Sequence, residues 1–302
     1  MKDSVLYSKV LDGTITDISP ELPAEFSDAD NAKTNPNSSG IDREDSMNYI
    51  CAPDLFRYCK NTSSLTLSYV LGNVSTYTVG SNVRTNQGIY GRIPKYLFQP
   101  VSLAQNLNYV FYMNMGITPY TWYDDDNYGN MIHVDTLSYN TGLKSVQGIF
   151  AGIHVPANII IPTALFSKNT QLQNVSRLFY GAIFYGPYSS VQQLSDSTFS
   201  NNKLITNISY MFAAPASTSP SANNNIKLIG SGLFNSTNHT KITNVTSFMM
   251  YQGATHGTVP AFWEWLTPTT ANRANVFLGV SKSKITNSDA IVSAGWGTGM
   301  IS

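Results

Sequence analysis

The fold is decided by the stretch Ile205-Thr206-Asn207-Ile208-Ser209-Tyr210-Met211-Phe212-Ala213. Its apolar residues stand three positions apart and are followed by an aromatic and a small residue. The same frame recurs along the chain, with its first apolar residue at Leu107, Leu143, Leu172, Ile205 and Ile242. These starts lie 36, 29, 33 and 37 residues apart. Self-similarity at such a period predicts a repeat architecture.

One polar position recurs inside this apolar frame. Asn174, Asn207 and Asn244 each stand two residues after the first apolar residue of their copy. A buried amide side chain needs hydrogen-bond partners, and Asn commonly finds them in the backbone of turns. We therefore expect these three asparagines to form a polar ladder in which each makes the same hydrogen bond to its own turn.

A second apolar motif precedes the clearest copies and ends in Leu-Phe or Thr-Phe. It spans 161–166, 194–199 and 229–234, with looser relatives at 52–56 and 93–98. Proline is favoured at the first position of a helix, so the prolines that open some of these motifs predict a single helical or 3-10 turn. Each unit therefore holds two short apolar pieces.

No single unit can bury its own apolar residues, but stacked units can share one continuous core. The sequence thus predicts a solenoid in which both motifs point large side chains inward. The predicted repeat core consists of Phe166, Leu178, Phe179, Phe199, Met211, Phe212, Phe234 and Phe248.

The segments 206–212, 174–179 and 243–249 resemble the T-N-V-S-x-M-F core of BspA-type leucine-rich repeats, which occur in bacterial surface proteins and some viral proteins. The resemblance implies an elongated repeat domain used for binding or assembly, with no catalytic residues. With it, the predicted fold class is α+β: an irregular leucine-rich-repeat-like solenoid of about 34-residue units, with short strands and short helical or 3-10 turns. The units here are longer than is common in that family.

Charge and composition divide the chain into three parts. Residues 1–45 carry ten acidic and four basic residues and are predicted to form an extended acidic arm and linker, the alternative being a frayed polar N-terminus. Residues 46–258 are predicted to form the repeat solenoid, and 259–302 a C-terminal cap and glycine-rich tail. Trp263 and Trp265 would either cover the last repeat or form an exposed aromatic binding patch.

Residues with chemical potential are few and scattered. Cys51 and Cys59 predict buried free thiols or, alternatively, a disulfide across one turn. The acidic run 124–126 is interpreted as a loop tip rather than a Ca²⁺ site, because it does not fit the spacing of a calcium loop. The four histidines lie in different units and show no metal-ligand spacing; they are His133, His154, His239 and His256. The sequence therefore predicts no enzyme, no cofactor and no metal.

The net charge is zero, which gives the whole chain no attraction for nucleic acid or anionic lipid. Its most apolar run, 159–162, is far shorter than the ~20 residues that span a bilayer, so neither a nucleic-acid partner nor a membrane span is expected. The chain also begins without a recognisable apolar secretion signal.

Only 12% of the residues are charged, whereas Asn, Ser and Thr number 29, 34 and 28. This composition resembles that of bacteriophage tail and fibre proteins. We therefore predict a structural protein of the virion whose partners are other virion proteins, copies of itself and a host-surface glycan or protein. The alternative is a bacterial adhesin or a glycan- or protein-binding module located outside the cell or on its surface.

Overall fold

The computed structural model describes ten segments of the chain. They are residues 56, 61–68, 76–79, 82–85, 96–112, 132–156, 161–185, 194–214, 229–253 and 257–302. The predictions on the arm 1–45, on Cys51 and Cys59, on the acidic run 124–126 and on His256 lie outside the described residues.

Regular secondary structure is sparse in these segments. Strands β1 (Thr76–Val79) and β2 (Asn82–Thr85) pair antiparallel, with Thr76 opposite Thr85, whereas β3 (His154–Pro156) and β4 (Ile183–Tyr185) pair parallel. The short 3-10 helices are η2 (Gln99–Val101), η3 (Phe262–Glu264), η4 (Ala271–Arg273) and η5 (Lys282–Lys284). The α-helix α5 (Ser288–Ser293) lies near the C-terminus.

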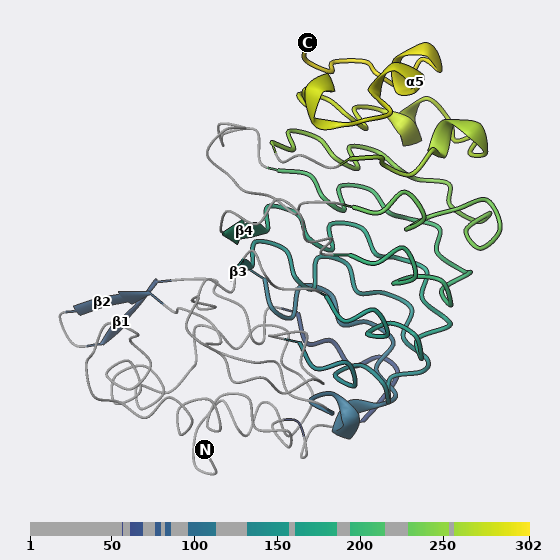
Figure 1. Cartoon of the computed structure of the whole chain (residues 1–302). Helices are drawn as coiled ribbons and strands as arrows, with labels where there is room; N and C mark the ends of the chain where they lie inside the picture. Colours follow the sequence, from purple (N-terminus) through teal and green to yellow (C-terminus); the bar gives the residue numbers. More distant parts are fainter. Residues whose placement is uncertain are drawn as a thin grey trace.

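Segments one repeat apart lie on one another as parallel layers. Parallel bridges join Asn106 to Ser145, Ser145 to Asn174, Asn174 to Asn207 and Asn207 to Asn244. Figure 1 shows the described coils rising in sequence order towards α5. The layers are therefore neighbours both along the sequence and in space.

Alternate backbone amides serve two different partners within each layer. The amides of Val175, Arg177 and Phe179 donate to carbonyls of the next layer at 3.0, 2.8 and 2.9 Å. The amide of Leu178, between them, donates instead to the Val175 carbonyl of its own turn at 3.3 Å. Buried backbone groups are thus satisfied by turns and interlayer bonds together, which explains why little of the stack is regular strand.

A left-handed residue bends each layer at the same place. It stands three positions after the bridging residue, in what we call the bend slot. Its occupants and φ angles are Tyr109 (55°), Gly148 (60°), Arg177 (57°), Tyr210 (55°), Ser247 (53°) and Asn275 (57°). A left-handed residue cannot continue an α-helix, so the apolar spacing of three produces a chain of turns here.

The core contains two columns of phenylalanine rings. In the first, Phe111, Phe150, Phe179 and Phe212 stack with ring centres 5.8 to 6.0 Å apart. In the second, Phe199 lies 5.2 Å from Phe166 and 5.4 Å from Phe234. All eight residues of the predicted repeat core are at most 2% exposed and belong to one continuous apolar cluster.

The predicted register of the first copy is wrong by three residues. Because Asn106 bridges Ser145, Leu107 corresponds to Val146, and the copy begins at Ala104 rather than at Leu107. Ala104 is fully buried in the position that Leu143 takes in the next layer. The sequence pattern places the start of this copy at Leu107 because it requires a large apolar residue at its first position, and Ala104 is small.

The interlayer backbone hydrogen bonds continue beyond residue 258, the predicted end of the repeat solenoid. The amides of Val245 and Met249 donate to Asn272 and Val276 at 2.8 and 2.9 Å, so 272–279 form a further layer. Trp263 and Trp265 pack against the core partly buried, and Trp296 is buried as well. The C-terminal segment thus extends the stack before closing it. The leucine-rich-repeat-like solenoid of class α+β itself stays a prediction.

Candidate binding face

The predicted polar ladder consists of three equivalent hydrogen bonds. The side-chain oxygen Oδ1 of Asn174 accepts the amide of Ser176 at 3.0 Å, and Asn207 and Asn244 do the same for Ser209 and Thr246 at 3.0 and 3.1 Å. Each asparagine closes the turn that precedes the bend slot. These bonds assign the Oδ1 atoms of the three asparagines to the architecture.

A second polar ladder, which the sequence analysis missed, lies inside the core. Asn169 Nδ2 donates to the carbonyls of Leu137 and Asn140 at 3.0 and 2.9 Å. Asn202 Nδ2 donates to Phe166 and Asn169 at 3.0 and 2.9 Å. Asn140, Asn169 and Asn202 are fully buried. Their signal in the sequence is an Asn three residues after Phe166 and Phe199, which end the second motif, and after Leu137 at the equivalent position of the preceding layer.

His239 takes the place of asparagine in the next layer of this ladder. Its Nδ1 accepts the Asn235 amide at 3.1 Å, which leaves Nε2 protonated to donate to the Phe199 carbonyl at 3.1 Å. Burial lowers the pKa of His239 because the imidazolium form loses its hydration, while the backbone hydrogen bonds to Phe199 and Asn235 act in the opposite direction. The ring is therefore a neutral structural group.

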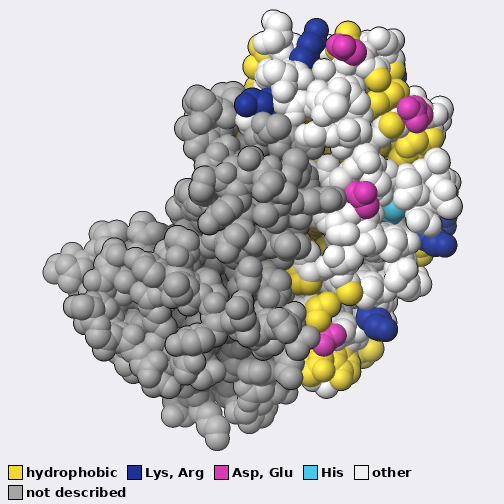
Figure 2. All heavy atoms as spheres, in the orientation of Figure 1, with side chains coloured by type: hydrophobic (Ala, Val, Ile, Leu, Met, Phe, Trp, Pro, Cys, Tyr) yellow, Lys and Arg dark blue, Asp and Glu magenta, His cyan; other side chains and the backbone are white. Residues whose placement is uncertain are grey.

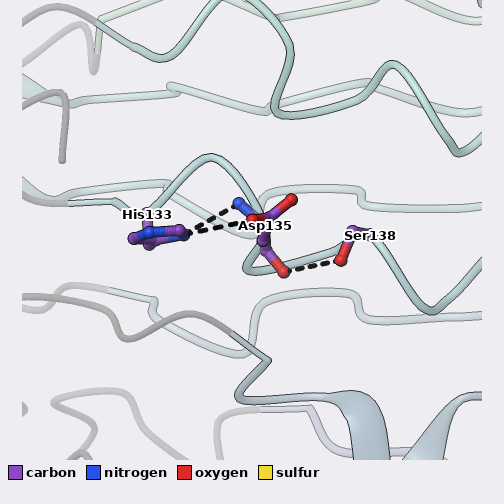
Figure 3. A network of polar contacts seen from close by, with 3 residues as sticks. All are labelled: His133, Asp135 and Ser138. Atoms are coloured by element: carbon purple, nitrogen blue, oxygen red, sulfur yellow. Dashed lines mark hydrogen bonds and ion pairs between the residues drawn. The ribbon is translucent and has the colours of Figure 1, made fainter. Parts of the chain in front are cut away.

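Figure 3 shows the polar contacts around His133, which is also buried. His133 Nδ1 accepts the Asp135 amide at 3.0 Å and lies 3.9 Å from Asp135 Oδ2. Ser138 Oγ donates to the Asp135 carbonyl at 3.0 Å rather than to the imidazole. The arrangement ties down a turn and does not place a nucleophile against a base. His154 lies in β3.

An arginine and two tyrosines from neighbouring layers form a half-buried cluster, which we call the Arg177 cradle. The guanidinium carbon of Arg177 lies 5.0 Å from the ring centre of Tyr210 and 5.7 Å from that of Tyr180. The two rings meet edge to face at 6.3 Å. Arg177 and Tyr210 occupy the bend slot in successive layers, so the layer stacking brings them together.

Polar side chains continue across the layers below the cradle. Gln147 Nε2 donates to Tyr109 Oη at 2.9 Å, and Gln147 Oε1 accepts Asn174 Nδ2 at 3.4 Å. Asn108 Oδ1 accepts the Gln147 amide at 2.9 Å. Tyr109 and Tyr112 meet edge to face at 5.7 Å. We call the cradle and these residues together the candidate binding face, since half-buried aromatic and amide groups are typical of recognition surfaces.

Figure 2 shows that charged side chains are sparse on the visible part of the described surface. Within the described segments, no three His, Cys, Asp or Glu side chains gather as metal ligands. The helices of these segments are also too short and too polar to cross a membrane.

Comparison with protein-family models, curated proteins and solved structures finds no match to this chain. The resemblance to BspA-type leucine-rich repeats therefore stays a prediction from residues 174–179, 206–212 and 243–249.

Proposed function

We propose that this chain is a non-enzymatic structural and binding protein of a bacteriophage virion, with a place in the tail. In this proposal a leucine-rich-repeat-like solenoid serves as a scaffold for assembly or for contact with the host surface. The observation that carries it is the Arg177 cradle, because stacked layers hold an arginine and two tyrosines half-buried on one face. Tyr and Arg are enriched where proteins bind other molecules.

Composition supports the virion part of the proposal. Neutral polar residues rather than charges solvate the chain, as in phage tail and fibre proteins. The acidic excess in residues 1–45 and the basic excess in residues 46–302, which carry fourteen basic and eight acidic residues, would favour contacts between copies of the chain. The partners proposed are accordingly other virion proteins and further copies of this chain.

Quantitative mass spectrometry of purified phage particles tests this function. We expect peptides of this chain at a fixed ratio to the major capsid protein, retained after the particles are banded twice in density gradients. A control preparation from uninfected cells should contain none. Recovery in the envelope of uninfected cells would contradict the virion proposal and favour the bacterial adhesin instead.

A further inference from the structure

The guanidinium of Arg177 is the charged centre of the candidate binding face. Within the described segments, its contacts are the two tyrosine rings, and no carboxylate there lies within ion-pair distance of it. A half-buried guanidinium has five N–H donors in a planar fork that fits a carboxylate with two hydrogen bonds. The cradle therefore holds a cation in a fixed position, where it can bind an anionic group.

We propose that the Arg177 cradle binds the carboxylate of an acidic sugar in a cell-surface polysaccharide. The proposal rests on the proposed function, since it names the ligand of that same binding face. The basic excess of residues 46–302 complements the charge of such a polymer. Tyr180 and Tyr210 present aromatic surface for the C–H groups of the sugar ring.

The polar part of the face suits sugar hydroxyl groups. Gln147 and Asn174 carry amides that both donate and accept hydrogen bonds. Both side chains are half-buried, Gln147 in the layer before the cradle and Asn174 in the layer of Arg177 itself. A saccharide needs such groups around its charged centre because each hydroxyl loses water on binding.

An extended peptide fits this face less well. Peptides that add to a sheet use unpaired backbone groups at an edge. Here the amides of Arg177, Phe179 and Tyr210 already donate to carbonyls of the next layer at 2.8 to 2.9 Å. Recognition at the cradle is therefore left to side chains, as the binding of a sugar acid requires.

Isothermal titration with trigalacturonate tests the proposal, with its methyl ester as the uncharged counterpart. We expect saturable binding of trigalacturonate that weakens with added salt, and binding of the methyl ester at least about tenfold weaker. Arg177→Gly should weaken trigalacturonate binding at least about tenfold. It should leave the melting temperature unchanged or higher, because Gly148 occupies the same slot with φ 60°.

The matched control is Arg273→Ala, which removes the other described arginine that lies over an aromatic ring, 5.7 Å from the centre of Trp296. This variant should bind trigalacturonate as the wild type does. Equal binding of acid and ester, or full binding by Arg177→Gly, would overturn the proposal, as would a preference for hexaglutamate over trigalacturonate.

The test also separates this inference from the proposed function. A protein that is found in virions but binds none of these probes refutes the sugar-acid ligand and leaves the virion role intact. Conversely, a protein that binds trigalacturonate through Arg177 but is absent from particles supports the ligand and refutes the virion role.

Discussion

Gly148→Ala is expected to destabilise the stack through one identifiable contact. Gly148 occupies the bend slot with φ 60°, and the ring of Tyr109 from the layer below lies directly against it. A Cβ at this position would stand 3.1 Å from Tyr109 Cζ and would overlap the nearer ring atoms. The ring cannot move without cost, because Gln147 Nε2 holds its hydroxyl at 2.9 Å.

Two costs combine in this substitution. Placing alanine in the left-handed region costs about 1–2 kcal/mol, and overpacking against the tyrosine ring costs about 1–3 kcal/mol. We therefore expect Gly148→Ala to lower the free energy of unfolding by about 2–5 kcal/mol. Urea denaturation followed by tyrosine and tryptophan fluorescence would measure this change.

Gly142→Ala is the matched control, since a Cβ there meets nothing within 4 Å and its φ lies outside the left-handed region. It should change stability by less than about 1 kcal/mol, and in the stabilising direction. In a Tyr109→Ala background, Gly148→Ala should cost only its backbone part, which gives a coupling energy of about 1–3 kcal/mol. A coupling near zero, or equal losses at Gly142 and Gly148, would refute the reasoning.

Three further predictions test the core, the inner ladder and its histidine. Phe199→Ala, in the middle of the second ring column, should lower the free energy of unfolding in urea by about 3–5 kcal/mol. Leu103→Ala, at a side chain that is 58% exposed, should change it by less than about 0.5 kcal/mol, and similar losses at both positions would contradict the packing. Asn202→Ala removes two buried side-chain hydrogen bonds, to the carbonyls of Phe166 and Asn169, which each keep one backbone amide donor. It should cost about 1–3 kcal/mol, against at most about 0.5 kcal/mol for exposed Asn201→Ala, and a harmless Asn202→Ala would show that the ladder is dispensable. Burial lowers the pKa of His239 below its ordinary value of 6.5, so the unfolded chain binds the proton more readily than the folded one. The contribution of His239 to stability is therefore fully present above pH 6.5 and is lost as the pH falls below 6.5. His239→Gln should flatten this loss between pH 7.5 and 5.5, and an unchanged urea midpoint profile would exclude His239 as its cause.

The sequence alone predicts the large buried residues of the repeats because their spacing repeats. Leu178, Met211 and Phe248 recur at corresponding positions, and each contributes to one continuous core. The Asn174 slot is equally visible, since a polar residue repeated inside an apolar frame needs a structural reason. These features depend on local sequence, which is why they can be read without knowing how the layers stack.

Features that depend on the stacking register were not predicted, because the sequence pattern does not show which residues the neighbouring layer buries. Asn169 and Asn202 have the composition of loop residues, yet they are buried because each donates to carbonyls of the preceding layer. The layer at 272–279 was not predicted because Thr270 and Arg273 stand where the apolar frame has its first two apolar residues. The Arg177 cradle joins residues 33 positions apart, and their contact follows only once the bridge between Asn174 and Asn207 fixes the register.

The bend slot explains how such a repeat can vary its surface while keeping its fold. The backbone conformation of this slot is the same in each layer, but its side chain changes from Tyr109 and Gly148 to Arg177, Tyr210 and Asn275. The hydrogen bonds that hold the layers together come from backbone amides, so they do not depend on which side chain the slot carries. A small residue such as Gly148 makes room for the ring of the layer below, whereas a large one such as Arg177 meets the side chain of the layer above. Substitution in this slot therefore changes the side chain that the face presents, at a cost that depends on the neighbouring layer. The cost is small where Gly replaces a residue with this φ, as in Arg177→Gly, and large where the ring of the layer below already fills the space, as in Gly148→Ala.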